Sequence, residues 1–521
     1  MFIMSFVPYG CEGVLVRIEV DIRRGIPGFD ISGLAAAAVR EAKDRVKAAF
    51  LNSGYNFPSD RILINLAPAG VKKDSAALDL PIALAVASAA GIVPKSGTTL
   101  VLGELELSGK LRPVRGVLAA VASAMKSGIN QFVLPAQNRM EAEILVKPEC
   151  IAGVSTLKEA IEALEYNEVH GVFPGEQSLC SKQSQIANET GSGDFADVYG
   201  QERYKRALEI AAAGGHNLLV FGPPGSGKTM LARRLPSIMA PLDMLESVEV
   251  TKLHSLALGD AATKLILSPP FRSPHHSASA EGILGGGKTV RPGEISLAHL
   301  GVLFLDEAPE FKMNVLQALR EPLEDRIITI SRAESSLRLP ADFQLVIAAN
   351  PCPCGKLGAL RPIGRGVMGS GCVCSGEEVN RYWRKLGGAL LDRVELRVPV
   401  RTPVIISRTK SSGEPSAVIA QRVKKAVEIQ RARYCKTDIR RNVNLEGEYL
   451  ERYCELDSEA SNALQTAVEK LGLSGRACHA VLRVARTIAD LEGREHLDAN
   501  HLLEAVQHRR LGDDPYDVLS V

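Results

Sequence analysis

Hydrophobic and polar positions change their spacing along the chain and divide it into three blocks. In residues 1–170, short β-type runs alternate with alanine-rich stretches of helical period, which is typical of an α/β or α+β domain. The pattern predicts strands at 14–20, 61–66, 99–102 and 132–134, and helices at 35–52, 78–90 and 117–127.

The second block, residues 194–400, contains continuous apolar runs at 217–221, 302–305 and 344–349, separated by segments of helix length. Strands without polar positions indicate a parallel sheet that helices cover on both faces.

The third block, residues 417–521, has a helical period throughout. One helix face is formed by Ala477, Ala480, Val481, Val484, Ala485 and Ile488. The polar segments 171–193 and 401–416 are rich in glycine, serine or proline and are expected to be linkers between the three domains.

The composition is ordinary, with 45% hydrophobic and 23% charged residues among 521. It excludes collagen-like, disordered and disulfide-scaffold proteins. No apolar run reaches the roughly 18 residues of a membrane span, and no basic segment precedes the apolar start, so we expect a cytoplasmic protein without a membrane partner. A net charge of +2 means that any DNA site is a local patch or a pore.

A glycine-rich segment follows the predicted strand 217–221 and opens a helix. It comprises Gly222, Pro223, Pro224, Gly225, Ser226, Gly227, Lys228 and Thr229, the G-x-x-x-x-G-K-T pattern of a phosphate-binding loop. Its N–H groups would surround the phosphates of ATP. Lys228 would reach the β- and γ-phosphates, and Thr229 would bind Mg²⁺.

Polar residues follow the other two apolar strands. Asp306 and Glu307 end the strand 302–305; Asp306 would hold Mg²⁺ and Glu307 would polarise the attacking water. Asn350 ends the strand 344–349 and could orient that water or the γ-phosphate. The alternatives are that the two acids cap the next helix and that Asn350 is a plain turn residue before a proline.

Four of the ten cysteines are clustered as two C-x-C pairs, Cys352 with Cys354 and Cys372 with Cys374. Four thiolates suit a closed tetrahedral Zn²⁺ site that would stabilise a glycine-rich loop. Free thiols and redox-active disulfides are the other two interpretations.

Together these motifs resemble those of known proteins. GPPGSGKT, LFLDEA and AAN, in this order, are similar to AAA+ ATPases. FRSPHHSASAEGILGGGKTVRPGEISLAHLGVLFLDE and ALLDRVEL resemble the magnesium-chelatase branch. RGIPGFDISGL and LINLAPAGVKKDSAALDLPIALA, near the N-terminus, resemble the YifB/ComM family of Mg chelatase-like ATPases.

The resemblance assigns roles to further residues. Tyr199 and Gly200 lie in the segment that contacts adenine in the family, and Arg393 matches the arginine finger that reaches a neighbouring subunit. Arg476 matches the sensor-2 arginine, unless it is a surface residue of an amphipathic helix. A finger that acts on the neighbour implies a ring, and a homo-hexamer is expected.

The resemblance also predicts the fold class: an S5-like α/β domain of the Lon-protease type, an AAA+ parallel-sheet core and a C-terminal helical lid. In the N-terminal block, Ala77 stands where Lon has its serine, and Leu118 and Ala120 where Lon has lysines. Ser75 lacks an assigned base, so we expect no proteolysis.

The implied function is that of an ATP- and Mg²⁺-dependent motor on single-stranded or branched DNA, similar to ComM-type branch-migration helicases in recombination and natural transformation. The alternatives are a chelatase-type motor that acts on a partner protein for metal insertion, and a Lon-like protease.

Several segments are candidates for DNA contact, for the lining of a pore or for ligand binding. The predicted hairpin 327–340 carries Arg332 and Arg338 beside a polar turn and would line the ring's pore together with the insertion 255–300. The basic stretch 421–442 is either a nucleic-acid contact or a solvated helix face. His275 and His276 are either structural or ligand-binding.

Overall fold

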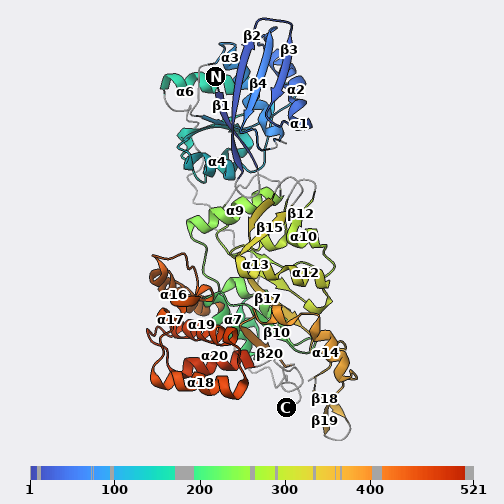
Figure 1. Cartoon of the computed structure of the whole chain (residues 1–521), viewed down its shortest axis with the longest axis vertical. Coiled ribbons are helices and arrows are strands. Elements are labelled where there is room, and N and C mark those ends of the chain that lie inside the picture. Colours follow the sequence, from blue (N-terminus) through green and yellow to red (C-terminus); the bar gives the residue numbers. More distant parts are fainter. Residues whose placement is uncertain are drawn as a thin grey trace.

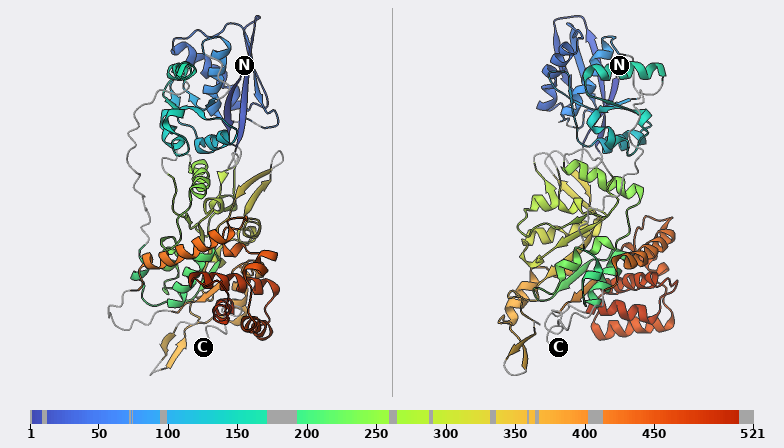
Figure 2. Two further views of the ribbon diagram at one scale, coloured as in Figure 1. Left: turned by 90° about the vertical axis from the view of Figure 1, so that its left-hand side faces the viewer. Right: turned by 180° about the vertical axis from the view of Figure 1, so that it is seen from behind.

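The computed structural model describes residues 2–8, 13–71, 73, 75–93, 99–170, 193–258, 265–287, 291–331, 336–357, 360–363, 367–401 and 413–510. We call 2–170 the N-terminal domain, 193–401 the core and 413–510 the lid. The N-terminal domain occupies one end of an elongated molecule, and the lid lies beside the core (Figures 1 and 2).

A seven-stranded mixed sheet, in the order β3-β4-β2-β1-β5-β8-β9, forms the N-terminal domain. The strands are β1 (Phe2–Val7), β2 (Val14–Arg23), β3 (Gly28–Ser32), β4 (Arg61–Ala67), β5 (Thr99–Val101), β8 (Gln131–Pro135) and β9 (Ile151–Val154), and a separate hairpin joins β6 (Glu104–Leu105) to β7 (Leu111–Arg112). The helices are α1 (Ala37–Arg40), α2 (Ala42–Asn52), α3 (Asp79–Ala89), α4 (Val117–Lys126), α5 (Arg139–Ala142) and α6 (Leu157–His170).

The helices of this domain cover both faces of its sheet. One apolar cluster contains α2, α3 and α6, and another contains α4. Helix α3 is apolar apart from Asp79 and Ser88, and its residues 79–88 are all buried, as expected for a helix in the middle of a core.

The helix predicted at 35–52 is wrong at its start. Ala35 forms an isolated β-bridge with Lys73, and its neighbour Ala36 donates its N–H to the Lys73 carbonyl. These contacts keep the first residues extended. The helix then begins at Ala37 and is interrupted at Glu41.

The core is built on a five-stranded parallel sheet in the order β11-β14-β17-β10-β20. Its strands are β10 (Leu218–Phe221), β11 (Phe271–Arg272), β14 (Val302–Leu305), β17 (Gln344–Ala349) and β20 (Leu396–Pro399). All residues of β10, β14 and β17 are buried, because helices cover both faces. This confirms the predicted AAA+ type of α/β core.

Nine helices and three hairpins surround this sheet in the described part of the core. The helices are α7 (Glu202–Gly214), α8 (Lys228–Ala232), α9 (Met244–Leu258), α10 (Ala280–Leu284), α11 (Glu294–Leu297), α12 (Met313–Ala318), α13 (Arg320–Asp325), α14 (Gly376–Arg384) and α15 (Gly388–Leu391). The hairpins pair β12 (Gly285–Gly286) with β13 (Arg291–Pro292), β15 (Ile327–Ser331) with β16 (Ser336–Pro340), and β18 (Leu360–Ile363) with β19 (Val367–Ser370). Hairpin β18–β19 projects from the end of the molecule remote from the N-terminal domain (Figure 1).

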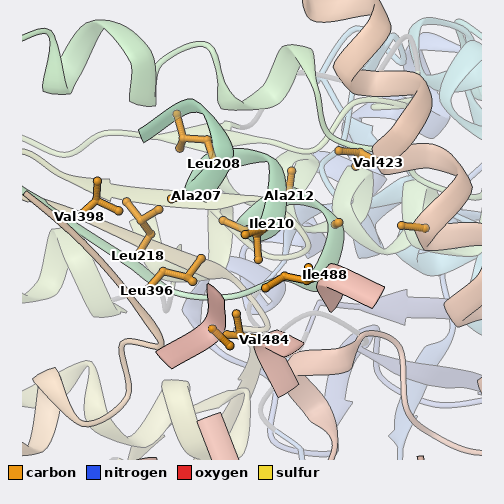
Figure 3. Close-up of a cluster of buried hydrophobic side chains, with 14 of the residues drawn as sticks. Ala207, Leu208, Ile210, Ala212, Leu218, Leu396, Val398, Val423, Val484 and Ile488 are labelled. Carbon is orange, nitrogen blue, oxygen red and sulfur yellow. The ribbon is translucent and has the colours of Figure 1, made fainter. Parts of the chain in front are cut away.

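The lid consists of α16 (Ser416–Tyr434), α17 (Gly447–Tyr453), α18 (Ser458–Leu471), α19 (Gly475–Leu491) and α20 (Ala499–Arg510). It shares one apolar cluster with α7 and the sheet: Val484 and Ile488 of α19 lie near Leu218 and Leu396 (Figure 3). The lid is therefore packed as part of the core's own hydrophobic interior.

Helix α9 connects the core to the N-terminal domain. Ser255 on α9 donates a hydrogen bond to Oε1 of Glu141 (2.9 Å), and the backbone N–H of Leu118 donates to the same oxygen (3.1 Å). Burial raises the pKa of Glu141. None of the helices in the described part of the chain is both long and apolar enough to cross a membrane.

Candidate functional site

The glycine-rich loop lies between the end of β10 at Phe221 and the start of α8 at Lys228. Gly222 cannot carry a side chain, because a Cβ would lie 2.1 Å from the Val400 carbonyl oxygen. Gly225 and Gly227 have φ values of 77° and 88°, a region that favours glycine, and no atom would contact a Cβ at either residue. The loop therefore closes tightly on the sheet and presents bare backbone on its outer side.

Lys228 lies at the bottom of this loop and is 8% exposed. Its ammonium donates to the carbonyl oxygens of Gly222 (2.6 Å) and Pro223 (3.0 Å) and to Oδ1 of Asn350 (3.3 Å). Burial lowers its pKa to about 8, although two nearby carboxylates oppose the shift. An anion that entered the loop would favour the charged form.

Thr229 and Asp306 form the adjoining part of the site. Thr229 Oγ1 donates to Asp306 Oδ2 at 2.8 Å. A hydroxyl oxygen and a carboxylate beside a phosphate loop are the ligand types that Mg²⁺ uses with nucleotides, so these two residues fit the ion. Glu307 follows with an exposed side chain and a left-handed backbone, at φ 51°.

The strand order explains why Asn350 joins this group. Strand β17 lies between β10 and β14, and its last residue, Ala349, pairs with Phe221. Since all three strands are parallel, the residues that follow them meet at one edge of the sheet. The loop, the two acids and Asn350 therefore form one site.

Gln201, the last residue of the segment expected to contact adenine, and Tyr204, which was not predicted, support this site. The Gln201 side chain donates to the carbonyl oxygens of Ser226 (3.1 Å) and Arg401 (2.7 Å), and the buried Tyr204 hydroxyl donates to the Lys228 carbonyl (3.1 Å). Both come from the segment that also contains the predicted adenine contacts: Tyr199, which is 63% exposed, and Gly200, at φ 70°. The fold adds the hydrogen bonds by which this segment is joined to the loop.

Arg393 and Arg476 lie at the opposite edge of the sheet. The Arg393 carbonyl accepts from Nδ2 of Asn217 (2.9 Å), the residue before β10, and both arginines form ion pairs with Glu324. The structure therefore brings the predicted finger and sensor-2 arginines to each other and does not bring either to the phosphate loop of the same chain.

These two arginines line a cavity of about 740 Å³ together with Arg441 and Arg483. Nη1 of Arg441 is buried and lacks a hydrogen-bond partner among the described residues, and burial lowers the pKa of this side chain to about 10. Arg441 was predicted only as part of the basic stretch 421–442 and Arg483 not at all, because their place in the cavity depends on the docking of the lid.

The four clustered cysteines converge as the spacing predicted. Their sulfur atoms all lie within 4.8 Å of one another. The Cys352–Cys354 pair is separated by 3.4 Å, and Cys372 lies 3.6 Å from each of them. These separations exceed a disulfide bond of about 2.05 Å and approach the edges of about 3.8 Å of a tetrahedron with Zn–S bonds of about 2.3 Å.

Most of the remaining candidate residues make contacts within the molecule. Arg338 is exposed on β16, opposite Thr329, while Arg332 lies outside the described residues. In the basic stretch 421–442, most side chains are engaged within the molecule. Ion pairs join Arg422 to Glu209 and Glu414, Lys424 to Glu428, Arg431 to Glu246, Arg433 to Asp490 and Arg440 to Glu249.

His275 and His276 pack against each other with ring centroids 4.1 Å apart, and His275 Nδ1 lies 2.8 Å from Ser277 Oγ. In the N-terminal domain, Ser75 accepts the N–H of Ala77 and so caps a short 3₁₀ turn, Ala76–Leu78. Lys73 nearby is fully buried and donates to the carbonyls of Gly33 and Pro68. The side chains of His275, Ser75 and Lys73 thus all make hydrogen bonds within the local structure.

Family models match all three parts of the chain. The model described as subunit ChlI of Mg-chelatase matches residues 18–138, that of magnesium chelatase, subunit ChlI, matches 194–406, and that of the ChlI C-terminal region matches 413–509.

Whole proteins match over nearly the full length. The chain is 41% identical over 507 residues to a YifB protein of Salmonella typhimurium, which covers 96% of this chain and 95% of the relative. It is 39% identical over 513 residues to the competence protein ComM of Haemophilus influenzae, with 98% and 97% covered. A magnesium-chelatase 38 kDa subunit of Rhodobacter capsulatus is 27% identical over 357 residues, 62% of this chain and 89% of that subunit. With this extent of identity, the chain belongs to the YifB/ComM family of magnesium chelatase-like proteins.

Proposed function

We propose that this protein is an ATP-hydrolysing AAA+ motor that assembles as a homo-hexamer and acts on DNA. The observation that carries the ATPase assignment is the meeting of the phosphate loop, two carboxylates and Asn350 at one edge of the parallel sheet. Few other functions require this set of groups at the end of three adjacent strands.

Each residue of the site has a distinct task. The loop N–H groups and Lys228 bind the phosphates and neutralise their charge, and Thr229 and Asp306 would hold Mg²⁺. Bound Mg²⁺ supplies Lewis-acid stabilisation of the phosphate oxygens. Glu307 accepts a proton from the attacking water, while Asn350 orients that water or the γ-phosphate. When ATP binds, Lys228 would give up its hydrogen bonds to the loop carbonyls and donate to phosphate oxygens instead.

The location of Arg393 and Arg476 supports a ring. Because both lie at the edge of the sheet remote from their own phosphate loop, their guanidinium groups can stabilise transferring phosphate only on another subunit. Glu324 pairs with both arginines in the single chain. We propose that the two arginines exchange Glu324 for the phosphates of a neighbour's nucleotide when subunits assemble.

The DNA assignment rests on the extent of the resemblance. The chelatase subunit aligns with 62% of this chain, whereas YifB and ComM align with 96% or more. The competence protein ComM therefore shares the N-terminal domain as well as the motor. We propose branch migration or helicase activity on single-stranded or branched DNA, with Arg338 of hairpin β15–β16 among the phosphate contacts in the pore.

A chelatase-type motor that remodels a partner protein is the second candidate, and the family models favour it by name. ATP hydrolysis measured with single-stranded, duplex and branched DNA at low salt separates the two. The DNA motor predicts stimulation by at least one of them and loss of nucleotide binding in Lys228→Ala. If none of the three DNAs bound or stimulated, the DNA assignment would fall while the ATPase assignment stood.

We also propose that Cys352, Cys354, Cys372 and Cys374 bind one structural Zn²⁺. The sulfur geometry supports it, and four thiolates are the donor set of closed zinc sites. Purified protein should contain about one zinc per chain, and the variant Cys352→Ser/Cys354→Ser should contain none. Metal analysis that finds equal, substoichiometric zinc in both would end this proposal.

A further inference from the structure

The cysteine cluster is joined to the nucleotide site by three separate contacts. The first is covalent: Asn350, which accepts from Lys228, is followed by Pro351 and then by the fully buried Cys352. The Tyr382 hydroxyl also makes a hydrogen bond with the Asn350 backbone. The position of this asparagine therefore depends on where Cys352 is held.

The second contact is made by Gly355, one residue after Cys354. A Cβ on Gly355 would lie 2.9 Å from Cγ of Pro224, inside the phosphate loop, and Gly355 has a φ of 74°. The backbone of the cysteine segment thus packs directly against the loop that binds phosphate, at a distance that only glycine permits.

The third contact runs through helix α14. Cys374 is followed by Ser375, which caps α14 in a capping box with Glu378. Trp383 at the other end of α14 is buried and donates to the Pro351 carbonyl (3.1 Å). Its ring packs edge-on against Phe221 with centroids 5.5 Å apart, and Phe221 is the last residue before the phosphate loop.

We infer that zinc in this cluster controls the ATPase site. By holding both C-x-C pairs together, the ion positions Asn350 from one side and the phosphate loop from the other. The cysteines and Gly355 are positioning residues, which do not touch nucleotide. The inference rests on the ATPase and zinc proposals above, and it adds that loss of zinc disables hydrolysis without unfolding the protein.

The chain offers a built-in reporter, because Trp383 is its only tryptophan. We expect that removal of zinc with a chelator shifts the Trp383 emission to longer wavelength as its packing against Phe221 loosens. Re-addition of Zn²⁺, but not of Mg²⁺, should restore it. Far-ultraviolet circular dichroism should change little, because these cysteines belong to one apolar cluster of the core, while the clusters of the N-terminal domain and the lid do not include them.

Two variants separate zinc binding from its effect. Cys372→Ser/Cys374→Ser, whose residues are remote in sequence from Asn350, should lose zinc and at least about tenfold in kcat. The control, Cys435→Ser, alters an exposed cysteine of the lid and should retain both zinc and wild-type kcat.

Gly355→Ala should keep its zinc and yet lose kcat or nucleotide affinity. Its control, Gly472→Ala, has a similar positive φ of 61° but open space around the Cβ.

Different results would refute the zinc site, the motor and the coupling between them. Absence of zinc from the wild-type protein would refute the metal site, and absence of ATP hydrolysis would refute the motor, in which case Trp383 emission and nucleotide affinity still test the coupling. If zinc left the protein while kcat, nucleotide affinity and Trp383 emission all remained at wild-type values, the proposed control would be overturned.

Discussion

At Glu307 the backbone leaves strand β14 in a left-handed conformation, φ 51°, which non-glycine residues rarely adopt. Such a residue costs on the order of 1 kcal/mol or more and persists where its surroundings hold it. Here the buried strand precedes it, and its N–H donates to Oδ1 of Asp306 (3.1 Å). The Glu307 side chain is exposed, whereas Asp306 is half-buried and accepts from Thr229, which supports the separate tasks that we propose for the two adjacent acids.

This division of tasks predicts the behaviour of Glu307→Gln. The amide keeps the size of the side chain but cannot accept the proton, so ATP should still bind while hydrolysis falls by about 10²–10⁴. Fluorescent-nucleotide binding and steady-state ATPase assays measure the two effects. Glu310→Gln changes another exposed acid three residues along and serves as the control. Equal losses of affinity and rate in Glu307→Gln would contradict a role in the chemical step.

Among the elements, the core and lid helix α19 meet through buried polar groups as well as apolar ones. His216, which follows α7, is fully buried, and its Nε2 lies 2.7 Å from Oγ1 of Thr487. Since the Thr487 hydroxyl donates to the Arg483 carbonyl, it accepts from His216, and Nδ1 of His216 lacks a partner within the described residues. Burial, assisted by the Arg483 charge, lowers the pKa of His216 to about 3.

A neutral buried histidine predicts that acid weakens this contact. The unfolded chain takes up a proton near pH 6.5 and the folded chain only near pH 3, so stability is complete above pH 6.5 and falls as the pH drops. The loss should approach about 1.4 kcal/mol per pH unit within this window. Thermal unfolding from pH 7.5 to 4.5 measures it. His216→Gln does not titrate and should show a shallower pH dependence; identical slopes for the two proteins would contradict the assignment.

For the whole molecule, the decisive feature is that the phosphate loop and Arg393 lie at opposite ends of the strands of the core sheet. The phosphate loop follows the carboxyl end of β10, while Asn217, which holds the Arg393 carbonyl, precedes its amino end. The site that we propose therefore takes Lys228, Asp306 and Glu307 from one subunit and Arg393 from the next. The lid reinforces this arrangement, because it brings Arg476 to the same edge as Arg393.

Mixing of two inactive variants tests this arrangement. Arg393→Ala should bind ATP but lose about 10³–10⁵ in rate, and Lys228→Ala should fail to bind while keeping an intact finger. In random hexamers roughly a quarter of interfaces would combine both intact residues, so mixtures should regain ATPase activity that neither parent shows. Flat activity at every ratio, with subunit exchange verified separately, would remove the role of Arg393 in trans and weaken the ring.

Local sequence patterns were sufficient to predict site residues that directly follow a recognisable strand. The loop 222–229, the acids after 302–305 and Asn350 after 344–349 were predictable, because a run of apolar residues identifies a buried strand and a parallel sheet gathers the residues that follow it. The cysteine cluster was predictable for a similar reason, since two C-x-C pairs 17 residues apart converge once a hairpin joins them.

The sequence by itself thus determined the family, strands β2, β4, β5, β8, β10, β14 and β17, and the residues that meet at the carboxyl ends of β10, β14 and β17. Only the tertiary structure decided which edge of the sheet Arg393 and Arg476 occupy, that Arg441 and Arg483 join them, and that Gly355 and Trp383 connect the cysteines to the phosphate loop. It also showed most of the basic residues of 421–442 to be paired within the molecule. The physical reason is that these contacts join segments distant in the chain, and their geometry follows from how the lid and α14 pack, which no local period encodes.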